Sequence, residues 1–168
     1  MSEKPAKRLP LHLLTLTLAR LLTGKGLKLA TAESCTGGLI AGACTDLPGS
    51  SDWLERGFVT YSNEAKAEML GVDAELIATR GAVSEEVVRA MAQGAIAHSR
   101  AQVAVAVTGV AGPSGGSASK PVGTVWFAWS VPGQLSIEIK HFAGDRTAVR
   151  AATVRHALQT LVELLDSH

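Results

Sequence analysis

The stretch Leu27-Lys-Leu-Ala-Thr-Ala-Glu-Ser-Cys-Thr-Gly-Gly-Leu-Ile40 changes from an apolar strand pattern to a helical pattern across a few small polar residues. Such a strand-to-helix turn presents free backbone N–H groups at the start of the helix. Together with the helix dipole, these groups favour a negative charge, either a bound phosphate or the oxyanion of an acyl-transfer intermediate. The stretch therefore predicts both a buried strand and an anion-binding turn.

Ser34 lies at this turn and is the candidate nucleophile. Two alternatives stay open at this point. Serines before a helix commonly serve as N-caps, and Cys35 is a rival nucleophile because a helix start lowers the pKa of a thiol. The surrounding residues match neither the Gly-x-Ser-x-Gly elbow of hydrolases nor the P-loop.

The length, composition and net charge of the chain limit which kinds of protein it can be. A chain of 168 residues with 46% hydrophobic residues predicts one packed domain over residues 1–168, and the polar residues 1–8 are expected to be disordered. The net charge of +1 gives no bulk electrostatic reason to bind nucleic acid or an anionic membrane. No stretch is long and apolar enough to span a bilayer.

Cysteines and histidines show no ligand pattern. Cys35 and Cys44 fit neither a zinc knuckle nor a redox pair, and we interpret them as reduced thiols of a cytoplasmic protein. The five histidines form no metal-binding motif. We therefore expect no metal and no cofactor.

Helical and strand patterns interleave along the chain and predict an α/β protein, a three-layer α/β/α sandwich with a mixed central sheet. Ser62 or Asn63, Ser84 and Asp145 are expected to cap helices. Helices are expected at about 9–23, after Ser34 to 47, 63–71, 74–79, 84–99 and from 145 through 165. Strands are expected at about 27–32, 57–61, 102–107, 122–131 and 135–142.

A second polar turn follows the apolar strand pattern at 102–107. It begins at Thr108 and continues as a loop rich in glycine to residue 116. In open α/β sheets, ligands bind outside the carboxyl ends of the strands. Because Ser34 and Thr108 both lie just past such ends, the two turns together predict a pocket. Thr108 is a candidate to hydrogen-bond the nucleophile or the substrate, and otherwise stabilises a turn.

A serine nucleophile needs a base. His141 is the best placed histidine, but it has no obvious acidic partner. Lys66 is the alternative if burial keeps it neutral, and otherwise it is a solvated helix residue. Tyr61 is a candidate to relay a proton or orient Lys66, or a packing residue. Arg146 would clamp a phosphate or lie on the surface.

Six segments resemble the CinA C-terminal domain family, the nicotinamide mononucleotide deamidases (PncC), and they occur in the family's order. The matching segments are Ala32-Glu-Ser-Cys-Thr-Gly-Gly38, Gly57-Phe-Val-Thr-Tyr-Ser-Asn-Glu-Ala-Lys66, Gly81-Ala-Val-Ser84, Thr108-Gly-Val-Ala-Gly-Pro113, Lys120-Pro-Val-Gly-Thr-Val125 and Gly144-Asp-Arg146. The length of the chain resembles the stand-alone deamidases rather than the longer CinA proteins.

The resemblance implies hydrolysis of the carboxamide of nicotinamide mononucleotide (NMN) in pyridine nucleotide salvage, by a homodimer. It implies Ser34 as nucleophile and Lys66 as base, with Tyr61 and Thr108 in support. A non-catalytic nucleotide-binding module is the alternative. Substrate contacts are expected from the residues around Ser34, from the glycine loop and from Arg146: Glu33, Cys35, Thr36, Gly37, Gly109, Gly112 and Arg146.

Overall fold

A mixed five-stranded sheet forms the centre of the protein, which a computed structural model describes for residues 8–167. The strands are β1 (Leu29–Glu33), β2 (Leu54–Val59), β3 (Val103–Gly109), β4 (Thr124–Val131) and β5 (Gln134–His141). Their order in the sheet is β2-β1-β3-β4-β5. β1 pairs in parallel with both β2 and β3, whereas β3, β4 and β5 are successively antiparallel.

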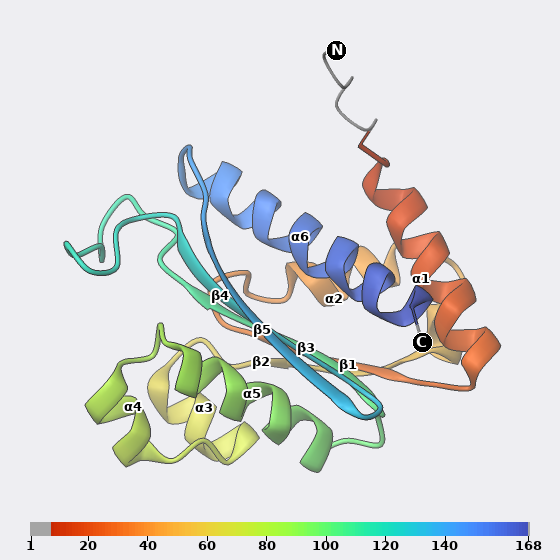
Figure 1. The fold of residues 1–168 in the computed structure, drawn as a ribbon, viewed down its shortest axis with the longest axis horizontal. Coiled ribbons are helices and arrows are strands. Elements are labelled where there is room, and N and C mark those ends of the chain that lie inside the picture. Colours follow the sequence, from red (N-terminus) through yellow and green to blue (C-terminus); the bar gives the residue numbers. More distant parts are fainter. Residues whose placement is uncertain (1–7, 168) are drawn as a thin grey trace.

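Helices cover both faces of the sheet, as predicted (Figure 1). One face carries α1 (Leu11–Lys25), α2 (Leu39–Thr45) and α6 (Arg146–Asp166), and the other carries α3 (Asn63–Leu70), α4 (Ala74–Arg80) and α5 (Glu85–Ala97). A short 3₁₀ helix, η1 (Ser50–Asp52), precedes β2. The expected α/β class with a mixed central sheet is confirmed.

β3 shows how the sequence pattern builds the two cores. Its valines at 103, 105 and 107 are fully buried beneath α1, α2 and α6, whereas Ala104 and Ala106 are fully buried on the face that α5 covers. Side chains alternate between the faces of a strand, so the Val-Ala repeat gives one bulky and one flat face. The flat face lets α5 approach the sheet closely.

Most predicted boundaries agree with the structure within a few residues, and Ser62, Ser84 and Asp145 cap their helices through side-chain oxygens. The helix expected directly after Ser34 instead begins at Leu39, because residues 34–38 form a turn with positive φ at Gly37 and Gly38. Of the residues predicted to be disordered, 1–7 lie outside the described part of the chain. No described helix could cross a membrane.

Gly94 sets the distance between α5 and the C-terminal end of α3. A Cβ atom at Gly94 would lie 2.1 Å from the carbonyl oxygen of Leu70. We expect Gly94→Ala to lower the free energy of unfolding by about 2 kcal/mol, because the helices must move apart. Gly24→Ala in α1 is the control, because a Cβ atom at this position would have no other atom within 4 Å. This substitution should raise the free energy of unfolding by about 0.5 kcal/mol. Equal urea midpoints for the two variants would contradict this account.

Candidate active site

The carboxyl ends of β1 and β3 bring the two predicted turns together. Glu33 at the end of β1 is in register with Val107 of β3, and the N–H of Ser34 donates to the Val107 carbonyl at 3.2 Å. Ser34 and Thr108 are therefore adjacent across the sheet at the edge where open α/β sheets bind ligands.

Lys66 reaches Ser34 from α3. Its Nζ lies 3.0 Å from the Ser34 Oγ, and the two residues are 1% and 8% exposed. The same nitrogen lies 2.9 Å from the carbonyl oxygen of Thr60, 3.2 Å from that of Tyr61 and 3.5 Å from that of Ser62. A buried amine thus contacts one hydroxyl and several backbone carbonyls.

The residues that follow β2 explain this placement. The N–H of Thr60 donates to the Glu33 carbonyl at 2.8 Å, which ties the end of β2 to the residue before Ser34. Ser62 then caps α3 by accepting from the Ala65 N–H at 3.0 Å. Lys66 lies in the first turn of α3, so its side chain extends back to the end of β1.

Burial lowers the pKa of Lys66 because an ammonium loses hydration inside the protein. No Asp or Glu of residues 8–167 forms a salt bridge with it. A neutral amine has two N–H donors, which the carbonyls of Thr60 and Tyr61 can accept, and one lone pair. The lone pair is then available to accept the proton of the Ser34 hydroxyl, as a general base must.

Glu33 is fully buried and structural. Its carboxylate accepts from the Thr36 hydroxyl at 2.6 Å, the Ile40 N–H at 2.8 Å and the Ala41 N–H at 3.1 Å. Both oxygens are engaged inside the protein, so the expected substrate contact is wrong for Glu33 and for the hydroxyl of Thr36. Glu33 instead holds the turn after Ser34 and accepts hydrogen bonds from backbone N–H groups at the start of α2, which have no partner within the helix.

The thiol of Cys35 is a poor nucleophile in this environment. The pKa of Cys35 is raised to about 11, mainly by burial and in smaller part by the neighbouring Glu33 carboxylate. The expectation that the helix start lowers this pKa is wrong, because α2 begins only at Leu39 and desolvation dominates. The protonated thiol leaves the Ser34 hydroxyl as the better placed group.

The side chains of Tyr61 and Thr108 make no hydrogen bond to Ser34 or Lys66, and Thr108 instead takes the stabilising role that the sequence offered as its alternative. The Tyr61 carbonyl contacts Lys66, but its side chain is 63% exposed and its hydroxyl lies 3.3 Å from Arg146 Nη2. Because Ser34 and Lys66 are in direct contact, proton transfer between them needs no relay through the phenol. The Thr108 hydroxyl donates to the Ala82 carbonyl at 2.9 Å and not to Ser34, which stabilises the strand end.

Arg146 lies at the start of α6 and joins Tyr61 to the glycine loop. Its Nη1 donates to the Gly112 carbonyl at 2.8 Å. Beside it lies a cavity of about 430 Å³, lined by the loop and by the start of α6: Ala111, Pro113, Val122, Gly144, Asp145, Arg146 and Thr147. Gly109 packs against β4, because a Cβ atom there would lie 2.8 Å from the Thr124 carbonyl oxygen.

Arg150 of α6 was not predicted from the sequence. Its Nε donates to the Cys35 carbonyl at 3.1 Å and its Nη2 to the Thr36 carbonyl at 3.3 Å. Gly37 lies against this guanidinium, since a Cβ atom there would be 3.6 Å from Nη2. Arg150 lies one helical turn after Arg146 and so on the same side of α6. That spacing was the only feature of the sequence that could have pointed to Arg150 as a site residue.

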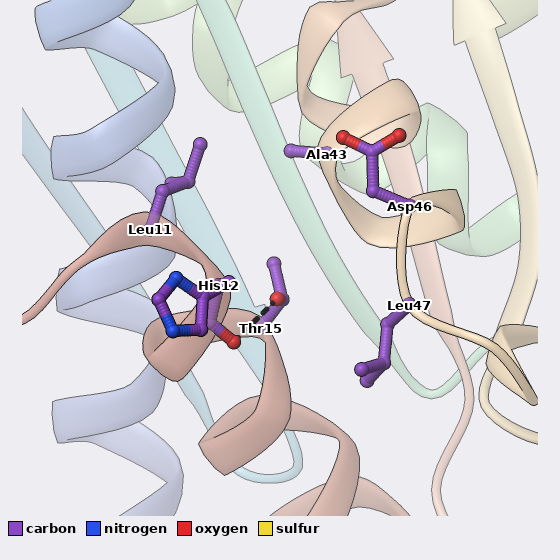
Figure 2. Close-up of a pocket in the computed structure, with 6 residues that line it drawn as sticks. All are labelled: Leu11, His12, Thr15, Ala43, Asp46 and Leu47. Atoms are coloured by element: carbon purple, nitrogen blue, oxygen red, sulfur yellow. Dashed lines mark hydrogen bonds between the residues drawn. The ribbon is translucent and has the colours of Figure 1, made fainter.

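Two other features lie away from Ser34. His141 lies on edge strand β5, three positions from β1 in the sheet, and its Nδ1 is 3.3 Å from the Thr124 hydroxyl of β4, so it is not the base. A pocket of about 340 Å³ lies between α1 and α2 (Figure 2), and its Thr15 hydroxyl is bonded to the His12 carbonyl at 3.0 Å. Within residues 8–167, no cluster of His, Cys, Asp or Glu could hold a metal ion.

Comparison with known proteins identifies the family. The sequence profile of the CinA C-terminal domain matches residues 12–165. The chain belongs to this family. Over 141 residues, 83% of this chain and 86% of the relative, it is 56% identical to "Nicotinamide-nucleotide amidohydrolase PncC" of Escherichia coli K12.

Further relatives of the CinA domain support this assignment. A protein of the same name from Pseudomonas putida is 53% identical over 92% of this chain and 97% of its own length. The crystal structure of competence/damage inducible protein CihA from Agrobacterium tumefaciens covers 98% of this chain and 99% of its own, with 49% identity and a TM-score of 0.88.

The buried carboxylate of Glu33 should contribute strongly to the stability of this CinA domain. Glu33→Gln replaces one acceptor oxygen with an NH₂ group that faces a donor, so we expect a loss of about 3 kcal/mol in the free energy of unfolding. Glu85→Gln, at an exposed ion pair with Arg89, is the control and should change it by less than about 0.5 kcal/mol. Urea denaturation measures both, and a similar small change in each would refute the structural role.

Proposed function

We propose that this protein is an amidohydrolase that converts NMN to nicotinate mononucleotide and ammonia. The observation that carries the proposal is the 3.0 Å contact between the Ser34 Oγ and the buried Lys66 Nζ. The names of its relatives from Escherichia coli and Pseudomonas putida support the same substrate. We further propose that it works in pyridine nucleotide salvage, in the cytoplasm and as a homodimer.

Acylation begins when the neutral Lys66 amine takes the proton of the Ser34 hydroxyl. The Oγ atom then forms a bond to the carboxamide carbon, and the carbonyl electrons move onto oxygen. The Lys66 ammonium returns its proton to the departing nitrogen as the C–N bond breaks, which releases ammonia. The pyridinium of the substrate withdraws electrons and eases the attack.

Deacylation uses the same two residues. Water loses a proton to Lys66 as it attacks the acyl carbon, and the Lys66 proton then returns to the Ser34 oxygen as the ester bond breaks. In both halves, backbone N–H groups of the turn after Ser34 hold the oxyanion. Loss of one such donor typically costs about 10²–10³ in rate.

The cavity beside Arg146 is the proposed site of the substrate phosphate. Arg146 supplies the opposite charge, and the glycine loop around Gly112 lets backbone approach closely. The exposed ring of Tyr61 lies next to Arg146 and offers an aromatic surface for the cationic pyridinium. This arrangement would place the nucleotide along the edge of the sheet, with its carboxamide toward Ser34.

Ser34→Ala should lower the rate of ammonia release from NMN by at least about 10³-fold, because the nucleophile of the acyl-enzyme is removed. Cys35→Ala is the matched neighbour and should keep most of the activity, since its thiol is protonated and buried. Ammonia is measured with NMN, nicotinamide and glutamine as substrates.

Three results would argue against the proposal. Near-normal turnover by Ser34→Ala would remove the serine mechanism, and an equal loss in Cys35→Ala would favour the thiol. Binding of NMN to the wild-type protein without ammonia release would instead identify a non-catalytic nucleotide-binding module.

A further inference from the structure

Three backbone N–H groups between Ser34 and Leu39, those of Cys35, Thr36 and Gly38, have no protein acceptor within residues 8–167. The Gly37 N–H is engaged, because it donates to the Ser34 carbonyl at 3.1 Å. Of the three, Thr36 belongs to the peptide whose carbonyl, that of Cys35, binds a side chain of α6.

Arg150 holds the other side of the same peptide group. The N–H of Thr36 and the carbonyl of Cys35 belong to one planar trans peptide, so they point in opposite directions. The Cys35 carbonyl accepts from Arg150 Nε at 3.1 Å, and the next carbonyl, that of Thr36, accepts from Nη2 at 3.3 Å. A rigid guanidinium that binds two successive carbonyls fixes the rotation of both peptide planes.

We propose that Arg150 is a positioning residue for the amide cleavage: it orients the Cys35–Thr36 peptide so that the Thr36 N–H faces the developing oxyanion. The inference rests on the proposed function. Preorganised donors stabilise an oxyanion only if they need not rotate during the reaction. A glycine at 37, with φ of +57°, leaves the turn free to rotate unless something holds it. The positive charge on the carbonyls also polarises both peptides toward stronger N–H donors.

The test compares Arg150→Met with Arg155→Met. Arg155 lies on the same helix and also donates to a backbone carbonyl, that of Leu9 at 2.5 Å, but it makes no hydrogen bond to the described residues of the Ser34 turn. In Arg150→Met we expect kcat for ammonia release from NMN to fall about 100-fold, as for loss of an oxyanion donor. KM should stay within about threefold, because ground-state binding is unchanged. Arg155→Met should keep wild-type kcat.

The pH profile distinguishes positioning from a role in proton transfer. Lys66 is untouched in Arg150→Met, so the pH dependence of kcat/KM should keep its wild-type midpoint while its height falls. Arg150→Lys is the second variant. It keeps the charge and the aliphatic stem but cannot donate to both carbonyls in the same geometry, so its kcat should stay well below wild type.

Several outcomes would overturn the inference. Wild-type kcat in Arg150→Met, or in Arg150→Lys if the first variant does not fold, would show that the turn needs no clamp. A raised KM with unchanged kcat would make Arg150 a substrate-binding residue instead. Absence of ammonia release by the wild-type enzyme would refute the proposed function itself. If the wild type releases ammonia and an Arg150 variant gives either of the two results above, only the role of Arg150 is refuted.

Discussion

The burial of the Lys66 amine against Ser34 is the constraint on which the site depends. Taking an ammonium out of water is costly, and nearby carbonyls offset the cost only in part. The fold meets this constraint by tying the end of β2 to the Glu33 carbonyl and by starting α3 at once, so that Lys66 is only 1% exposed. The resulting fall in its pKa is in the direction that the proposed role of Lys66 as a base requires.

The turn after Ser34 is held from two directions. The Glu33 carboxylate accepts from the Thr36 hydroxyl of the turn and from the Ile40 N–H at the start of α2, and Arg150 donates to the carbonyls of Cys35 and Thr36 from α6. Arg146, one turn earlier on the same helix, reaches the glycine loop and Tyr61. α6 therefore joins the nucleophile turn to the cavity proposed for the phosphate, although it is distant from both in sequence.

Sequence patterns predicted the elements well where a local cause determines them. The cap at Ser84 and the Val-Ala alternation of β3 are local, and both are found. Contacts between distant segments were not predictable in this way: Lys66 was assigned through the family resemblance, and Arg150 was missed. The wrong expectations for Glu33 and Cys35 share one cause, because burial by the rest of the fold decides which polar atoms remain available.

The most direct test of the account is the protonation state of the Lys66 amine. NMR titration of protein labelled with ¹³C and ¹⁵N in lysine follows Cε and Nζ, and the signal lost in Lys66→Met assigns the residue. The account predicts that Lys66 titrates well below the ordinary lysine pKa of about 10.4 and is neutral over the pH range in which ammonia is released. Titration together with the surface lysines, with activity present while Lys66 is charged, would contradict it.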